Sequence, residues 1–304
     1  LEDMEPGVYH EGEFDDMPPQ YAKTRETNPD YTNYREEGGQ GLHGFHSHLH
    51  SDWDLRRGIA CYYGMTSLID QEVGRLLDTL KRLGIADNTL VLFSTDHGHY
   101  LGQHGLIAKG AFHYEDMLRI PMIVRYPRVV PAGSRSDALQ CQVDWPVTFL
   151  SAAGIPVPGL MQGRNQLPTW SSDAAQARDW VLVENRHNPT TVHLRTLVTQ
   201  RYKLTVYREA SYGELFDLRA DPGELDNRID DPALAGARNK LMAINSGVQI
   251  GLLNGGEVCS EAVPRRGQDG KLRPKQYSAV GGQVDFLRAA MRSKGGKGIL
   301  TIRS

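Results

Sequence analysis

The sequence lacks several features that would place a protein in a class at once. No apolar run approaches the roughly 20 residues that a helix needs to cross a bilayer, which excludes a transmembrane helix within these residues. The formal net charge is only -3, so no overall charge favours nucleic acid or an anionic membrane as a partner. Internal repeats are absent, and the chain begins at Leu1 without the charged and apolar regions of a signal peptide.

Cysteine is also scarce. The three cysteines, Cys61, Cys141 and Cys259, are widely spaced and odd in number, so they indicate neither a disulfide framework nor a CxxC metal site. We interpret them as small buried side chains. A chain of 304 residues, 39% of them hydrophobic, is long enough to form a core in one large domain with a smaller appendage.

Hydrophobic periodicity predicts an α/β organisation in the first half of the chain. Apolar residues recur at spacings of three and four across residues 54–84, which predicts a long amphipathic helix. The runs at 90–95 and 122–127 predict two buried strands, and residues 144–154 predict another helix that ends on a glycine. Helices alternating with strands indicate a sheet sandwiched by helices.

The second half changes character. Four short runs rich in β-branched and aromatic residues predict a small antiparallel sheet over residues 180–218, and residues 231–244 predict a closing helix. Residues 1–53 are predicted to form loops and short turns. No structure is assigned to the glycine-rich, mildly basic tail. We therefore expect three parts with the boundaries 1–175, 176–245 and 246–304.

The chemically informative stretch is STDHGHYLGQHGLIAKG, residues 94–110. Asp96 and His97 directly follow a predicted strand, and a carboxylate beside an imidazole suits a divalent cation. Lys109 lies twelve residues beyond His97 and carries the positive charge that an anionic substrate needs. A polar turn that closes an ordinary strand is the alternative interpretation.

Several motifs follow one another in a fixed order. Residues 60–127 contain an aspartate before VGRLL, then DNTLV, DHG, LGQHG, a lysine and RIPMIVRYP, and YKLTVYR and GELFDLRADPGELDN come later. This order closely resembles the type I sulfatases of the alkaline phosphatase superfamily, over roughly residues 50–245. So many ordered elements are far more specific than one short motif.

The resemblance implies roles for individual residues. Asp96 and His97 would bind the active-site metal, usually Ca²⁺ in this family, and Lys109 would contact the sulfate as a catalytic and substrate-binding residue. His104 lies in the LGQHG segment, and we expect it in the catalytic pocket, with a hydrogen bond that orders the loop as the alternative. Because Ca²⁺ prefers oxygen ligands, the histidine leaves Zn²⁺ and Mn²⁺ open.

The resemblance also implies an activity, the metal-assisted hydrolysis of a sulfate ester. Such sulfatases use a formylglycine nucleophile made from Cys or Ser in C-x-P-x-R, and an upstream pair of aspartates completes the metal shell. The motif does not occur in this sequence. We therefore expect the C-terminal portion of an enzyme, inactive by itself: 1–175 from the alkaline-phosphatase-like catalytic domain, 176–245 a small α+β subdomain, and 246–304 a tail.

Two other readings stay open. One is a phosphonate monoester or phosphodiester hydrolase of the same superfamily, and the other is a non-catalytic binding fragment. The expected partner is a sulfated small molecule or carbohydrate, with neither nucleic acid nor a transmembrane segment involved. The oligomeric state is not assigned. Members of the family are often exported, which is compatible with a periplasmic or secreted protein, but the sequence assigns no compartment.

Two further polar groups receive structural interpretations. Glu115 and Asp116 beside Arg119 are expected to form a charged helix face with local ion pairs. The second group consists of four histidines: His43, His46, His48 and His50. Their spacings would suit a zinc ion, but the glycine and serine residues around them favour a polar loop.

Overall fold

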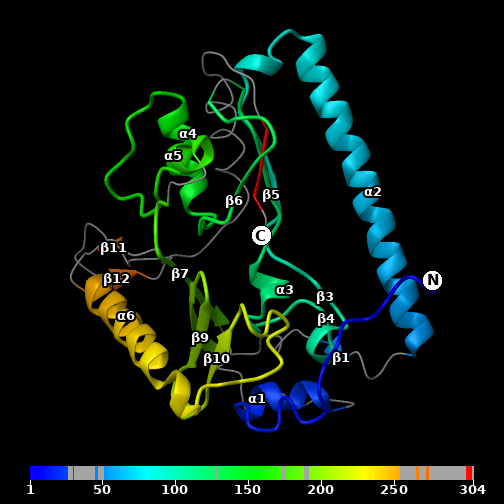
Figure 1. The fold of residues 1–304 in the computed structure, drawn as a ribbon, viewed down its shortest axis with the longest axis vertical. Helices are drawn as coiled ribbons and strands as arrows, with labels where there is room; N and C mark the ends of the chain where they lie inside the picture. The colour runs from blue at the N-terminus through cyan, green and yellow to red at the C-terminus, as the bar shows by residue number, and fades with distance from the viewer. Residues whose placement is uncertain are drawn as a thin grey trace. The chain divides into compact units, whose positions relative to one another are not determined.

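The structure, a computed structural model, describes residues 1–26, 30, 45–46, 51–127, 129–172, 176–187, 192–253, 265–266, 272–273 and 299–302 (Figure 1). The helices are α1 (Pro19–Ala22), α2 (Asp52–Arg82), α3 (Glu115–Leu118), α4 (Asp144–Ala152), α5 (Leu167–Ser171) and α6 (Ala235–Leu253). The strands are β1 (Phe45–His46), β2 (Val91–Ser94), β3 (Tyr100–Leu101), β4 (Leu106–Ala108), β5 (Met122–Arg125), β6 (Ser134–Ser136), β7 (Trp180–His187), β8 (Val192–Thr199), β9 (Tyr202–Tyr207), β10 (Gly213–Asp217), β11 (Arg265–Arg266), β12 (Leu272–Arg273) and β13 (Ile299–Ile302). Among the helices described, none combines the length and apolar character that crossing a bilayer requires.

The chain forms two compact units. The first unit contains residues 1–82, 95–120 and 184–241, and the second contains residues 83–94, 121–183 and 242–304. The expected division at residues 175 and 245 is not tested by this partition and stays a prediction.

The long helix α2 confirms the predicted helix over residues 54–84. The Ser51 hydroxyl accepts the backbone N–H of Asp54 at 3.1 Å and so caps the helix start. Acidic residues in the first turn and basic residues in the last oppose the helix dipole favourably. Gly84 has a φ of 69°, a left-handed conformation typical of the residue that follows a helix.

The apolar side of α2 stays exposed, although its periodicity predicts a buried face. Ile59 is the one residue of the helix that is buried. Leu68, Ile69 and Leu76 are all exposed, as is Cys61, so the interpretation of that cysteine as a buried side chain is wrong. Cys141 is half-buried, and Cys259 lies outside the described residues.

The second unit is a sheet with helices against it. Its strand order is β2-β5-β13-β6, in which β5 runs antiparallel to both β2 and β13. Met122 and Val124 of β5 are buried against apolar side chains of α4 and α5, whereas the alternate residue Ile123 is exposed. The two predicted strands and the predicted helix α4 are confirmed, but β13 comes from the tail to which no structure was assigned.

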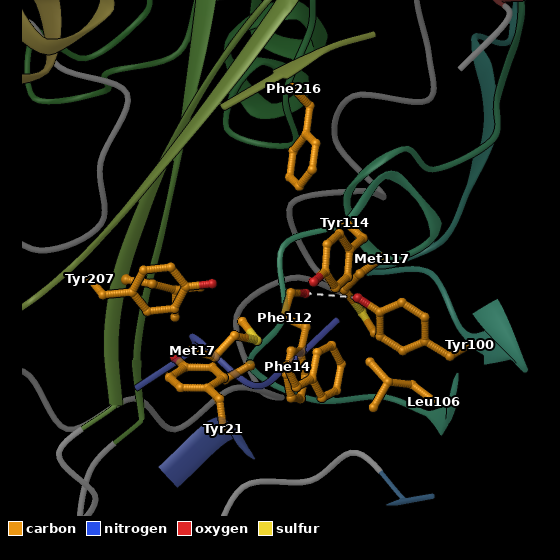
Figure 2. Packing of buried hydrophobic residues seen from close by; sticks show 12 residues of the cluster. Phe14, Met17, Tyr21, Tyr100, Leu106, Phe112, Tyr114, Met117, Tyr207 and Phe216 are labelled. Carbon is orange, nitrogen blue, oxygen red and sulfur yellow. Dashed lines mark hydrogen bonds between the residues drawn. The ribbon is translucent and has the colours of Figure 1, made fainter. Parts of the chain in front are cut away.

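The first unit contains most of the antiparallel C-terminal sheet, whose order is β10-β9-β8-β7 and of which only residues 184–187 of β7 belong to this unit, and a small sheet with the order β1-β4-β3. The predicted sheet over residues 180–218 and the closing helix, now α6, are thereby confirmed. Figure 2 shows the core of this unit, where aromatic side chains dominate. Phe14 stacks on Phe112 with ring centroids 5.3 Å apart, and Tyr21 meets Tyr207 edge to face at 5.1 Å.

This core draws on three distant parts of the chain. Phe14 and Tyr21 come from the N-terminal segment, and Phe112 comes from the connection between β4 and α3. Tyr207 and Phe216 come from the C-terminal sheet. The mixed α/β class and the C-terminal antiparallel sheet agree with expectation. The segment that carries the candidate site is therefore packed into the same core as the C-terminal sheet.

The contrast between exposed and buried leucines gives a test. Leu76 is 66% exposed and Leu204 is 1% exposed. Leu76→Ala should change the free energy of unfolding by no more than about 0.5 kcal/mol, whereas Leu204→Ala should cost about 2–5 kcal/mol because it leaves a cavity. Urea denaturation of both variants measures this. A cost at Leu76 comparable to that at Leu204 would show that the α2 face is covered in solution.

Candidate functional site

A short hairpin explains how Lys109 returns to His97. Strands β3 and β4 pair antiparallel, with Tyr100 opposite Ala108 and Leu101 opposite Ile107. The next position outward on β4 is Lys109, which the hairpin thus carries back beside the start of β3. Gly102, with a φ of 110°, provides the conformation that the tight connection requires.

Three polar groups converge at the ring of His97. Its Nε2 lies 3.5 Å from Asp96 Oδ2 and 3.4 Å from Lys109 Nζ. Its Nδ1 lies 2.8 Å from the carbonyl oxygen of Gly98, which can only accept a hydrogen bond, so Nδ1 carries the proton. In the neutral ring, this tautomer leaves the lone pair on Nε2, which is the form of histidine that binds a metal.

The carboxylate of Asp96 is kept ionised. Burial of the group opposes ionisation, but the His97 ring, the Thr95 hydroxyl at 3.1 Å and the backbone N–H of His97 at 3.1 Å lower its pKa overall. Asp96 remains largely exposed, so solvent or a ligand has access to it. Thr95 was not singled out from the sequence, because a threonine beside an aspartate has no distinctive signal.

The turn that follows rests on α3. The N–H of Gly98 donates to the carbonyl of Met117 at 2.8 Å. A Cβ on Gly98 would lie 1.7 Å from the carbonyl oxygen of Asp116, closer than any side chain permits. Only glycine fits this contact, which explains why the third position of the DHG motif is a glycine.

His104 lies in the interior rather than at the surface. Its side chain is 1% exposed, its Nδ1 is hydrogen-bonded to Glu13, and its ring stacks on Tyr114 with centroids 3.5 Å apart. Its Nε2 is 3.9 Å from Asp116 Oδ2, and its φ is 55°, a strained value for a non-glycine residue. Contacts of this kind suit the loop-ordering alternative, and the role of His104 in the pocket stays a prediction.

Two neighbours of the site were missed by sequence reasoning. Tyr62 of α2 stacks on His99 with ring centroids 5.0 Å apart. Burial, with the adjacent His97 and Lys109, lowers the pKa of His99. Glu13, the partner of His104, lies 91 residues away in sequence, and such long-range pairs leave no local pattern.

The four histidines between residues 43 and 50 were expected to lie in a polar loop. His43, His48 and His50 lie outside the described residues, and only the backbone of His46 is described.

The donor set suits part of a metal site. A separation of 3.5 Å between Asp96 Oδ2 and His97 Nε2 lets both reach one cation at bond lengths of about 2.0–2.6 Å. Within the described ranges, no cluster of three or more His, Cys, Asp or Glu side chains is arranged to hold a metal ion. Two protein ligands are fewer than the four that zinc or the six or more that calcium usually takes, so further ligands are needed.

Comparison with known families covers residues 10–246 of the chain. A sequence profile of the sulfatase family matches residues 10–155, and one described as the C-terminal part of N-sulphoglucosamine sulphohydrolase matches residues 102–246. The chain is 32% identical over 199 residues to N-acetylglucosamine-6-O-sulfatase of Bacteroides thetaiotaomicron, covering 63% of this chain and 36% of that protein. The chain belongs to the sulfatase family. The expected family is thereby confirmed.

Other relatives of this sulfatase-family chain agree. Choline-sulfatase of Rhizobium meliloti is 31% identical over 182 residues, covering 59% of this chain and 34% of the relative. A solved structure in complex with its substrate D-glucosamine-2-N,6-O-disulfate matches with a TM-score of 0.63 and 30% identity, covering 69% of this chain and 44% of that one. The chain thus spans about a third of the length of these sequence relatives.

Two further matches are more limited. A phosphonate monoester hydrolase from Silicibacter pomeroyi matches with a TM-score of 0.65 over 90% of this chain and 55% of its own, but at 20% identity it shows the fold alone. A profile described as the acetyl-CoA hydrolase/transferase C-terminal domain matches residues 223–304, mostly outside the described residues, and bears on none of the site residues.

Substitution of Gly98 tests the contact with α3. Gly98→Ala should lower the free energy of unfolding by about 1–3 kcal/mol because the new methyl group overlaps the backbone of α3. The control is Gly74→Ala in α2, where nothing lies within 4 Å of the added Cβ. That control should stabilise the helix by about 0.5–1 kcal/mol. Equal effects of the two changes in urea denaturation would contradict the geometry.

His113 makes stability depend on pH. Burial, with Lys203 nearby, lowers the pKa of His113 from 6.5 to about 3, and its Nδ1 lies 2.8 Å from Thr196 Oγ1. The unfolded chain takes up a proton near pH 6.5 but the folded chain does not, so stability is lost as the pH falls. At pH 5.5 this group costs about 1.4 kcal/mol relative to pH 7.5.

The variant His113→Gln, which keeps a polar group but cannot titrate, should remove that part of the pH dependence. Urea denaturation at pH 7.5 and pH 5.5 measures it, with His10→Gln at an exposed position as the control. An unchanged difference between the two pH values in His113→Gln would disprove the assignment.

Proposed function

We propose that residues 94–110 form part of the active site of a sulfate-ester hydrolase. Asp96 and His97 bind a divalent cation, and Lys109 binds the oxyanion of the ester. The observation that carries the proposal is the convergence on His97 Nε2, with Asp96 Oδ2 at 3.5 Å and Lys109 Nζ at 3.4 Å. Membership of a hydrolytic family and sequence relatives named as sulfatases support it.

The chemistry follows from the charges of these groups. When bound, the cation polarises the ester oxygens and stabilises the charge that develops as the ester bond breaks. Ca²⁺ is the expected ion, with Zn²⁺ and Mn²⁺ as alternatives because one ligand is an imidazole. Lys109 neutralises a sulfate oxygen, which also offsets the repulsion between its ammonium and the cation. His104 orders the loop through Glu13 and Tyr114.

The proposed nucleophile is a formylglycine outside these 304 residues, because C-x-P-x-R does not occur in them. The proposed substrate class is a sulfated carbohydrate, since one relative is named N-acetylglucosamine-6-O-sulfatase and another was solved with a sulfated glucosamine.

By itself, the chain should not turn over 4-nitrophenyl sulfate, because it lacks the segment that would form the nucleophile. Turnover by the purified chain at an ordinary enzymatic rate would contradict the missing nucleophile.

A second candidate is phosphonate monoester or phosphodiester hydrolysis, as in other hydrolases of the same superfamily. Sulfate and phosphate esters have similar shapes, and the three site residues suit either. The complete protein decides between them when 4-nitrophenyl sulfate and bis-4-nitrophenyl phosphate are compared as substrates.

Calorimetric titration with Ca²⁺ and Mn²⁺ tests the metal ligands in the chain itself. We expect affinity in about the millimolar range from two protein ligands, and a tenfold or greater loss in Asp96→Asn, because the carboxylate charge is removed. Lys109→Met should retain the cation and lose affinity for a sulfated monosaccharide. The control is Asp70→Asn, at an exposed position on α2. Equal affinity in Asp96→Asn and Asp70→Asn would rule out Asp96 as a ligand.

A further inference from the structure

A buried lysine of the C-terminal sheet contacts Glu115, the first residue of α3, and Glu224, which follows the sheet. Lys203 lies on β9 and is fully buried. Its Nζ is 2.5 Å from Glu224 Oε1 and 3.2 Å from Glu115 Oε1. A buried ammonium group is tolerated only when opposite charges lie close to it. The Lys203 ammonium is therefore held in place by these two carboxylates. Glu115 therefore pairs with a distant lysine, where the sequence predicted local ion pairs on its helix.

Glu224 also caps α3. Its Oε2 accepts the backbone N–H of Glu115 at 2.6 Å, which satisfies one of the N–H groups that a helix start leaves unpaired. Glu224 has a φ of 54°, a left-handed conformation that is strained for a residue other than glycine. Strain of this kind persists only where surrounding contacts hold the residue. The two oxygens of one carboxylate thus connect the lysine to the helix.

The other end of α3 supports the candidate site. The carbonyl of Met117 accepts the N–H of Gly98 at 2.8 Å, and the carbonyl of Asp116 lies directly against Gly98. Gly98 is the residue after His97, and its own carbonyl accepts from His97 Nδ1. A continuous series of contacts therefore runs from Lys203 through α3 to the ring of His97.

We propose that Lys203 and Glu224 are positioning residues for the candidate metal ligands. Their ion pair fixes α3, and α3 fixes the turn that carries Asp96 and His97. The importance of this turn rests on the proposed function, but the contacts between Lys203, α3 and Gly98 do not. Removal of the ammonium leaves the buried Glu224 carboxylate near the half-buried Glu115 carboxylate, and their repulsion should open the start of α3.

The experiment uses the complete chain and observes the turn by NMR. The probes are hydrogen exchange at the Gly98 amide and the imidazole signals of His97. In Lys203→Met and Glu224→Gln, the Gly98 protection factor should fall at least tenfold, and the His97 signals should shift. The control Arg201→Met removes the partly exposed Arg201–Asp217 ion pair beside the same strand, and it should change Gly98 protection less than twofold.

Comparison with other amides separates positioning from general destabilisation. The reference is Leu215 of β10, whose N–H donates to the Asn227 side chain. A loss at Gly98 that exceeds the loss at Leu215 supports the proposal, and equal losses overturn it. If Lys203→Met fails to fold, Glu224→Gln gives the same comparison. Lys203→Arg, which keeps the charge, should restore most of the protection, and its failure to do so would count against an ionic mechanism.

Metal binding is read separately in the same samples. Added Mn²⁺ should broaden the His97 signals of the unchanged chain, and Lys203→Met should need at least tenfold more Mn²⁺ for the same broadening. Absence of broadening in the unchanged chain would defeat the proposed function and leave the Gly98 comparison to decide the positioning role.

Discussion

The close approach of Gly98 to the backbone of α3 is the constraint on which the candidate site depends. It fixes the turn after Asp96 and His97 from one side, with no room for a side chain at Gly98. The β3–β4 hairpin brings Lys109 to the same imidazole from the other side. The turn and the hairpin belong to one segment whose ends lie close together, since Ser94 pairs with Met122 across β2 and β5. Closure of the loop between these two strands limits the conformations open to the site.

Tyr114 connects the hairpin with the C-terminal sheet. Its ring stacks on His104, and its hydroxyl donates to Glu214 of β10 at 3.3 Å. Glu214 also accepts from Tyr207 at 2.7 Å, so a fully buried carboxylate is satisfied by phenol hydroxyls. Burial nevertheless raises the pKa of Glu214. Aromatic packing and buried hydrogen bonds therefore act on the same few side chains, and His104 takes part as a member of this core.

Sequence reasoning works best where the signal is local. Asp96, His97 and Lys109 lie within fourteen residues of one another, and the structure brings all three side chains together. It failed where partners were distant, as for the pairing of Lys203 with Glu115, 88 residues apart. The apolar periodicity of α2 predicted the helix correctly but not its exposure, because periodicity identifies a face without identifying what covers it.

The position of the chemistry on a short segment has a thermodynamic consequence. Residues 95–110 contribute few large apolar side chains of their own, Tyr100 and Leu106 being the buried ones, so their order must come from neighbouring elements. The N-terminal segment contributes Phe14 and Glu13, and the C-terminal sheet contributes Lys203 through α3. Because each contribution crosses many residues of sequence, local opening of the segment is coupled to the packing of both. A site built in this way gains its geometry from the same interactions that stabilise the unit, and its ligands are only as well positioned as α3 is fixed.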